Sequence, residues 1–346
     1  MSFDYDVVIV GLGPAGATLA RLLGPKFRVA CVDKKGGEGG FTKPCGGLLA
    51  PDAQRALSSF GLTLPVQILA DPQIFSVKTF DLKSGLTRHY QRFYLNTDRH
   101  KLDMWLISLI KGADIFAPAS VTSVSRENGG FRIALSDGRA ITARYAVGAD
   151  GSNSIVRRTF FKRHIRRYVA IQQWFTGVSN PFYCSFFDEN ITDCYAWCEA
   201  KDGFTVLGAA LPAKGARVAF EQLKERLAPH GFTLGKQIKT EACMVSRPSS
   251  PFEFALENGG AFLIGEAAGF ISPSSLEGIS YALDSARALA EAFTEDFKSP
   301  ARLYRLKTRK LRLKLTAKFL KAPFMYRPLL RRLILRSGLD SIKVDE

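Results

Sequence analysis

The chain has 346 residues, 46% of them hydrophobic and 23% charged, with a formal net charge of +16. This length suits about two domains, and the composition excludes a disordered, collagenous or disulfide-scaffold chain. No uncharged run approaches the ~20 residues of a membrane span, and the acidic start at Asp4 and Asp6 is unlike a secretory signal. We therefore expect a cytoplasmic protein. Its six cysteines form no Cys-x-x-Cys pair, so we expect no metal site.

Residues 4–10 form an apolar run that predicts a buried parallel strand. A glycine turn of the pattern G-x-G-x-x-G follows, then a helical segment and a second strand over residues 27–33. Gly11 permits the tight turn, Gly13 lets the backbone approach a pyrophosphate, and Gly16 lets helix and strand pack closely. The acid that ends the second strand is placed to bind ribose hydroxyls. This unit predicts a dinucleotide site, for NAD or FAD, that uses Gly11, Gly13, Pro14, Ala15, Gly16 and Asp33.

Two later segments repeat the arrangement of an apolar strand that ends in glycine and an acid. In residues 144–158 the strand leads to Asp150-Gly151, and in residues 261–284 it leads to Gly265-Glu266. Alone, either segment fits a strand-to-helix turn of any α/β core. Their order and spacing behind the first motif make them informative together.

The three segments resemble the FAD motifs of the geranylgeranyl reductase family, which belongs to the p-hydroxybenzoate-hydroxylase type of flavoproteins. The narrower likeness is carried by the run Lys-Pro-Cys-Gly-Gly at 43–47, by Arg99, and by Tyr-Ala-Trp at 195–197. It covers residues 4–298 and is nearest to a bacterial branch of the family. The resemblance implies FAD as the cofactor.

The resemblance also implies roles for individual residues. The Glu266 carboxylate, where the family usually has Asp, would bind the ribityl hydroxyls of FAD. Arg99 would reach the phosphates or the ribityl chain, although a solvated arginine at a helix start is the alternative. The helix opened by Gly278 would direct its positive end at the flavin and favour the reduced form. The other implied cofactor contacts are Cys45, Gly46, Gly47, Asp150, Gly151, Gly265, Pro273 and Ile279.

Cys45 precedes two glycines in a loop that the family places at the active face of the flavin. We take it as the candidate catalytic residue. A free cysteine is also often a small buried hydrophobe. Both interpretations stay open, because thiol reactivity depends on a pKa that sequence does not give.

The expected fold is α/β: a Rossmann-like FAD-binding domain, an inserted and mainly antiparallel β-sheet domain for the substrate, and a basic helical C-terminal segment. We assign residues 1–70, 98–160 and 258–300 to the first domain, and 71–97 and 161–257 to the second. Alternating aromatic residues in the second domain either line an apolar pocket or belong to the core. They are Phe175, Phe182, Phe186, Tyr195 and Trp197. After the Tyr-x-Trp motif this chain has Glu199-Ala200, where the family usually has Phe-Pro.

The segment 301–346 carries 14 Lys/Arg and 3 Asp/Glu, so 14 minus 3, or +11, of the net charge lies here. At helical spacing its apolar residues fall on two faces. One face has Tyr304, Leu311, Leu315 and Phe319, and the other has Leu306, Leu313 and Leu320. The segment either packs on the protein on two sides with its basic side chains outward or binds an anionic membrane surface. No nucleic-acid module accompanies the charge, so we expect no nucleic-acid partner.

These features predict an FAD-dependent oxidoreductase that reduces a carbon–carbon double bond of an apolar, isoprenoid-like molecule or lipid by hydride transfer from reduced flavin. A monooxygenase on the same fold is the alternative, because a fold does not fix the reaction. A membrane-associated protein with a structural FAD is a third interpretation. The sequence has no separate nicotinamide fingerprint, so the electron donor stays open between NAD(P)H and another reductant.

Overall fold

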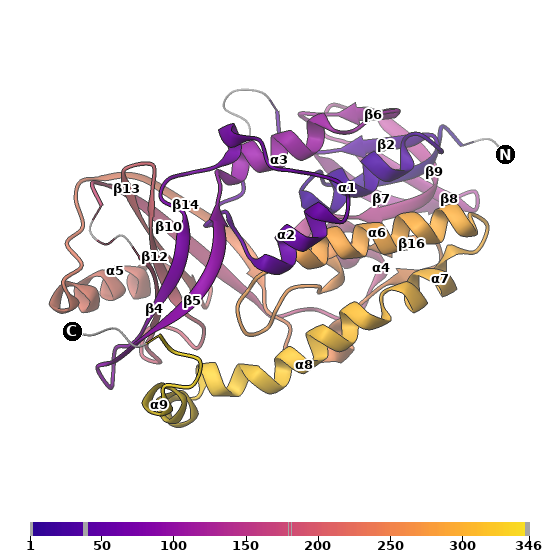
Figure 1. Cartoon of the computed structure of the whole chain (residues 1–346). Coiled ribbons are helices and arrows are strands. Elements are labelled where there is room, and N and C mark those ends of the chain that lie inside the picture. The colour runs from indigo at the N-terminus through magenta and orange to yellow at the C-terminus, as the bar shows by residue number, and fades with distance from the viewer. Residues whose placement is uncertain (1–2, 37–40, 179, 181, 343–346) are drawn as a thin grey trace.

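The computed structural model describes residues 3–36, 41–178, 180 and 182–342. Within these residues the chain forms two β-sheets, with helices packed on their faces and a run of C-terminal helices along the outside (Figure 1). The expected mixed α/β architecture, with a first sheet that is parallel at its centre, a second and mainly antiparallel sheet and a helical C-terminal region, is confirmed. The predicted domain boundaries stay a prediction.

The first sheet has the strand order β15-β16-β9-β1-β2-β6, with the hairpin β7–β8 joined to β9. Its centre is parallel: Val7 of β1 pairs with Val29 of β2 on one side and with Tyr145 of β9 on the other. The strands are β1 (Tyr5–Val10), β2 (Val29–Val32), β6 (Ala113–Phe116), β7 (Val121–Glu127), β8 (Gly130–Leu135), β9 (Ala140–Gly148), β15 (Glu257–Asn258) and β16 (Ala261–Leu263).

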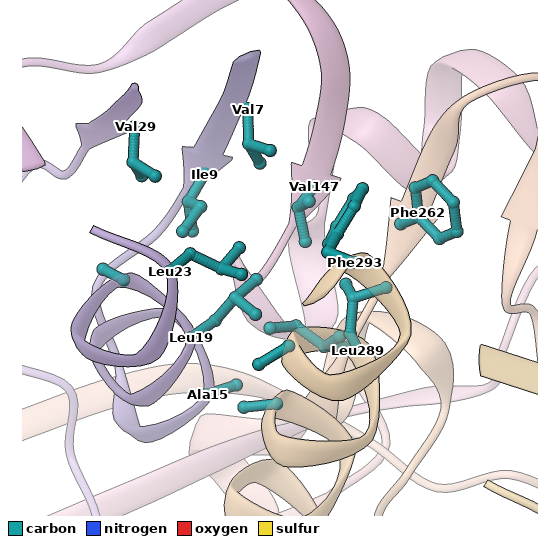
Figure 2. Packing of buried hydrophobic residues seen from close by; sticks show 14 of the residues in the cluster. Val7, Ile9, Ala15, Leu19, Leu23, Val29, Val147, Phe262, Leu289 and Phe293 are labelled. Atoms are coloured by element: carbon teal, nitrogen blue, oxygen red, sulfur yellow. The ribbon is translucent and has the colours of Figure 1, made fainter. Parts of the chain in front are cut away.

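Two helices cover one face of this sheet because each presents an apolar stripe to it. They are α1 (Pro14–Leu23) and α6 (Ile279–Glu295). Figure 2 shows Leu19 and Leu23 of α1 and Leu289 and Phe293 of α6 pointing toward the apolar side chains of the central strands. The strand, turn, helix and strand expected from the first motif therefore fold as one packed unit.

The second sheet has the order β14-β10-β13-β12-β11-β4-β5-β3 and is antiparallel except for the pair β11–β4. The helix α5 (Ala216–Leu227) packs on one of its faces through Phe220, Leu223 and Leu227. The other face is turned toward the first sheet's loops. The strands are β3 (Leu48–Leu49), β4 (Ile74–Asp81), β5 (Leu86–Asn96), β10 (Arg167–Thr176), β11 (Tyr183–Phe187), β12 (Ala196–Lys201), β13 (Phe204–Leu211) and β14 (Gln237–Ser246).

The C-terminal helices tie the two sheets together. Tyr304, Leu311 and Leu315 are buried against the first sheet, and Arg331 is paired with Asp81 of the second sheet. The second apolar face, with Leu306, Leu313 and Leu320, is exposed. The interpretation that this segment packs on the protein on two sides is therefore wrong. The C-terminal helices are α7 (Pro300–Lys307), α8 (Arg309–Tyr326) and α9 (Pro328–Ser337), and three further α-helices are α2 (Pro51–Ser58), α3 (Arg99–Ser108) and α4 (Ile155–Phe160).

Among the residues with a described position, no helix combines the length and apolar character needed to cross a bilayer.

Candidate functional site

A cavity of about 1520 Å³ lies where the two sheets meet. Its walls are the C-terminal ends of β1 and β2, the loop 43–47, the N-terminus of α6, one face of the second sheet, and parts of α8 and α9. The predicted residues that line it are Gly11, Gly13, Pro14, Ala15, Asp33, Cys45, Gly46, Gly47, Arg99, Asp150, Gly151, Tyr195, Trp197, Glu266, Gly278 and Ile279. Gly16, Gly265, Pro273, Phe175, Phe182 and Phe186 lie outside the described wall.

The glycine turn leaves room for a phosphate group. Gly11 has a φ of +97°, which side chains other than glycine rarely adopt. A Cβ on Gly16 would lie 1.8 Å from the Gly11 carbonyl oxygen, so this glycine is required by packing. A Cβ on Gly13 would meet no described atom within 4 Å. Gly13 opens α1 and lines the cavity, and this space at a helix N-terminus fits a pyrophosphate.

Asp33 joins a network of charges at the edge of the cavity. Its carboxylate accepts the backbone N–H groups of Leu12 and Lys35. Lys35 Nζ lies 3.6 Å from Asp33 and 3.5 Å from Asp103, and Arg99 Nε donates to Asp103 at 3.1 Å. Burial opposes the charge on Arg99, but the Asp103 carboxylate outweighs it and raises the guanidinium pKa. The network therefore fixes two cations and two carboxylates at the wall, where the cations can meet the phosphates of a dinucleotide and Asp33 its ribose hydroxyls.

Asp150 presents a buried oxygen that lacks a hydrogen-bond partner among the described residues. Its Oδ2 accepts the Ile155 N–H at 2.7 Å, whereas Oδ1 has no hydrogen-bond partner in the described part of the chain. Burial raises the pKa of Asp150 to about 6. A buried acceptor of this kind requires a donor, and the ribose and ribityl hydroxyls of FAD are donors. The residue set therefore fits FAD.

Glu266 is already anchored on both of its oxygens. Oε2 lies 2.7 Å from Lys43 Nζ, and Oε1 accepts the Ser246 N–H at 2.8 Å. Burial disfavours the charged Lys43 ammonium, but Glu266 overcomes this and raises its pKa. The extra methylene of Glu thus lets one carboxylate connect the loop 43–47 to β14. Its predicted contact with the ribityl chain stays a prediction.

The N-terminus of α6 faces the cavity, whereas Gly265 and Pro273, two of the predicted cofactor contacts, lie outside the described cavity wall. Gly278 and Ile279 line the cavity at the first turn, so the positive end of the helix dipole is directed there. The N–H of Gly265 donates to the hydroxyl of Ser285 in α6 at 2.9 Å. The Pro273 carbonyl accepts Arg247 Nε at 3.1 Å. Gly265 and Pro273 are therefore positioned to shape the loop between β16 and α6.

Cys45 lies in the cavity wall beside Arg99. Its Sγ accepts the Gly47 N–H at 3.5 Å, and Arg99 is close enough for the thiol to act on the guanidinium pKa. The residue is partly exposed, unlike the core cysteines Cys31 and Cys184. Its surroundings are those of a cavity residue, and a role in catalysis stays a prediction.

Behind this loop lies a buried acid that sequence reasoning did not assign to the site. Both oxygens of Glu199 lack a hydrogen-bond partner among the described residues, and Oε1 lies 3.9 Å from Lys201 Nζ. Lys201 donates to the carbonyl oxygens of Gly46 and Thr97. Burial raises the pKa of Glu199 to about 7, and Lys201 offsets only part of this. Lys201 therefore holds the Gly46 backbone against β12.

This buried acid predicts a pH-dependent stability. The folded state keeps the Glu199 proton up to about pH 7, whereas the ordinary value is 4.5, so stability falls as the pH rises between these values and the loss is complete above pH 7. The free energy of unfolding of Glu199→Gln, taken relative to that of the parent protein, should therefore rise by roughly 2–3 kcal/mol from about pH 5 to about pH 8. Urea unfolding at both pH values measures this gain. Exposed Glu225→Gln is the control, and an equal response of both variants would contradict the prediction.

The predicted aromatic pocket is corrected in part. Tyr195 and Trp197 line the cavity. Phe175 and Phe186 are buried in the core between the second sheet and α5, and Phe182 packs against the same cluster. Phe175 and Phe186 point to the opposite face of the sheet because neighbouring strand residues alternate between faces, and they are core residues. Phe182 lies just before β11 and is partly buried against the same core.

Several cavity residues were missed from sequence. Lys35 and Asp103 lie in the charge network, Lys43 pairs with Glu266, and Tyr94 donates to Glu277 at 3.0 Å. Lys35 and Lys43 stand close in sequence to predicted residues, which was a usable signal. The contact between β5 and the loop before α6 joins residues far apart in sequence, and no local pattern marks it.

Fold, charge network and open glycine turn define a flavoprotein of the FAD-dependent oxidoreductase class. Comparison with known proteins agrees: residues 4–226 match the family described as "FAD binding domain". The protein CbrA of Escherichia coli O6:H1 is 50% identical over 98% of this chain and 94% of its own length. CbrA of Shigella flexneri serotype 5b shows the same values.

Two solved structures share the fold. A geranylgeranyl bacteriochlorophyll reductase-like protein of Thermoplasma acidophilum has a TM-score of 0.77 at 19% identity, covering 95% of this chain and 98% of its own. PqsL, a probable FAD-dependent monooxygenase of Pseudomonas aeruginosa, has a TM-score of 0.72 at 20% identity, covering 97% and 99%. The chain belongs to the FAD-binding-domain family, in the branch that contains CbrA. The membership in a family of FAD-binding proteins that the resemblance implied is confirmed.

Proposed function

We propose that the protein reduces a carbon–carbon double bond of an apolar, isoprenoid-like substrate. The observation that carries this proposal is the cavity itself. It continues from the glycine turn, past Tyr195 and Trp197, to apolar side chains of α8 such as Leu320 and Phe324. A space of about 1520 Å³ is larger than the ~300–1,000 Å³ of ordinary small-molecule sites, so it has room for a long apolar chain beside a dinucleotide.

The residues around the glycine turn would hold FAD, which supplies hydride transfer when bound. Gly13 and the N-terminus of α1 would receive the pyrophosphate, and Asp33 the adenosine ribose. Arg99 and Lys43 bring positive charge to the same wall. The second sheet covers this region and helps to exclude water from the reacting atoms.

The step adds a hydride to one alkene carbon and a proton to the other, so the substrate gains two hydrogens. Two side chains at the wall carry a proton that could be transferred to the substrate. Tyr94 Oη is the weaker acid, because it donates its proton to Glu277 at 3.0 Å and because burial together with Glu277 raises its pKa. Cys45 is the second, and the one we favour from its position between Arg99 and the glycines. An NAD(P)H-class or other reductant would restore the flavin.

Incubation of FAD-loaded protein with a detergent-dispersed polyprenyl alcohol tests the proposal. NADPH, NADH and dithionite are compared as reductants, each without air, and the two nicotinamides also in air. We expect the lipid to gain two hydrogens, as read by mass spectrometry, without air. Gain of one oxygen in air would identify a monooxygenase instead, and unchanged lipid with all reductants would contradict the proposal.

Cys45→Ala tests the catalytic assignment in the same assay. We expect it to keep FAD and to slow reduction by roughly a hundredfold or more, the usual contribution of a proton donor. Cys184→Ala, in the core beyond the sheet, is the control for loss of a thiol. Equal rates for both variants would remove Cys45 from the mechanism.

A further inference from the structure

The outer face of α8 is apolar and open to solvent. Leu313, Leu320 and Phe324 are 59%, 77% and 48% exposed. Their spacing of seven and four residues places them on one side of the helix. Leu311 and Leu315 lie about half a turn away and are buried in the core. We call the three exposed side chains the α8 stripe; they remain uncovered although the other side of the same helix is packed.

Basic side chains flank the α8 stripe. Arg309, Lys310 and Lys321 are exposed on either side of it. In the part of the chain that is described, Lys314 of α8 pairs with Asp52, whereas none of these three forms a salt bridge. Between residues 301 and 336 the chain has 13 Lys/Arg and no acid. Partial burial and the neighbouring Lys318 and Arg92 lower the pKa of Lys321, which indicates that cations are crowded there.

The α8 stripe also reaches the cavity. Leu320 and Phe324 are exposed on the surface and line the cavity at the same time. Lys318, Lys321 and Arg92 line the same part. The far end of the substrate space therefore opens beside an apolar surface ringed by positive charge. Figure 1 shows α8 along the outside of the molecule, between α7 and α9.

We propose that α8 docks on an anionic lipid bilayer, with the α8 stripe in the acyl-headgroup boundary and its flanking cations at the lipid headgroups. Apolar side chains beside Lys/Arg are the composition of helices that lie in a membrane surface. A symmetric second copy would bring two strongly basic faces together, which repels. A nucleic acid would match the charge but would leave the aliphatic side chains without bases to stack on them. Only the identity of the molecule that enters the cavity rests on the proposed function.

Vesicle flotation of the full FAD-loaded chain tests this surface. Vesicles of phosphatidylcholine alone are compared with vesicles that also contain phosphatidylglycerol. We expect binding to the anionic vesicles and a loss of that binding as salt is raised. Arg309→Gln with Lys310→Gln should weaken binding about fivefold per residue, from ~1 kcal/mol for each cation.

Leu313→Asp is the sharper variant, because Leu313 lies in the α8 stripe and outside the described cavity wall. We expect it to weaken binding to anionic vesicles at least about tenfold, the loss of one inserted Leu. Val218→Asp on α5, at a site 63% exposed, is the matched control and should bind as the parent does. Both variants should keep the parent melting temperature.

Three outcomes would overturn the inference: equal binding to both vesicle types, equal binding by both aspartate variants, or a self-association that Leu313→Asp abolishes without any vesicle binding. Turnover of detergent-dispersed lipid without vesicle binding would refute the docking surface alone. Vesicle binding without turnover would refute the proposed reaction alone.

Discussion

A Gly13→Val variant is expected to fold like the parent protein and to lose FAD. A Cβ at Gly13 meets no described atom within 4 Å, so the substitution costs the fold about 1 kcal/mol, the preference for glycine over an aliphatic residue at a helix N-cap. The added side chain fills the space that the pyrophosphate requires. We expect the FAD affinity to fall at least about a hundredfold, because the close backbone approach is blocked.

Fluorescence titration with FAD and thermal unfolding of the apoprotein measure the two effects separately. Gly13→Ala should give an intermediate loss of affinity. Ser299→Val is the matched control, because Ser299, like Gly13, is an N-cap followed by proline, but it is exposed at α7 and does not line the cavity. FAD affinity unchanged in Gly13→Val would place the dinucleotide elsewhere.

Arg331→Met is expected to destabilise the protein by about 3–5 kcal/mol, the usual result of leaving a buried charge without its partner. Arg331 Nε donates to Asp81 Oδ2 at 2.8 Å, and both side chains are buried. The guanidinium also donates to the carbonyl of Met325 at the end of α8, at 3.1 Å. One side chain therefore ties α8 and α9 to β4.

Urea unfolding followed by far-ultraviolet circular dichroism measures this effect. The double variant with Asp81→Asn should recover part of the loss, because it removes the unpaired carboxylate. Exposed Arg336→Met on α9 should change stability by no more than about 0.5 kcal/mol. Equal stability of Arg331→Met and Arg336→Met would show that the tail helices are not held by this ion pair.

The FAD-binding part was predictable because its signals are local. The glycines at 11, 13 and 16 and the acid at 33 lie within one strand–helix–strand unit, where steric needs fix the residue types. The segment at 265–266 was equally readable. What the sequence could not show was that Glu266 already contacts Lys43, which lies 223 residues earlier.

The faces of the second sheet could not be assigned from sequence. On β11, Tyr183, Ser185 and Phe187 line the cavity while Cys184 and Phe186 enter the core. Aromatic side chains stand on both faces, so alternation alone does not choose between them. The choice is made by α5, whose apolar side covers one face, and its docking depends on the tertiary fold.

The tail shows the same limit. Its two apolar faces were visible in the sequence, but Leu311 and Leu313 are equally apolar, and only packing against the first sheet buries one and leaves the other exposed. Glu199 was visible as a departure from the family pattern. Its burial beneath the Gly46 backbone follows from the pairing of β12 in the sheet, and this gave the acid its raised pKa.

The most direct measurement is the visible absorption spectrum of the purified protein, with the released cofactor identified by chromatography. The binding surface of the glycine turn, Asp33 and the Arg99 network predicts a yellow protein that releases FAD in a ratio near one per chain. A colourless protein that takes up no flavin after soaking in excess FAD and gel filtration would contradict this account of the cavity.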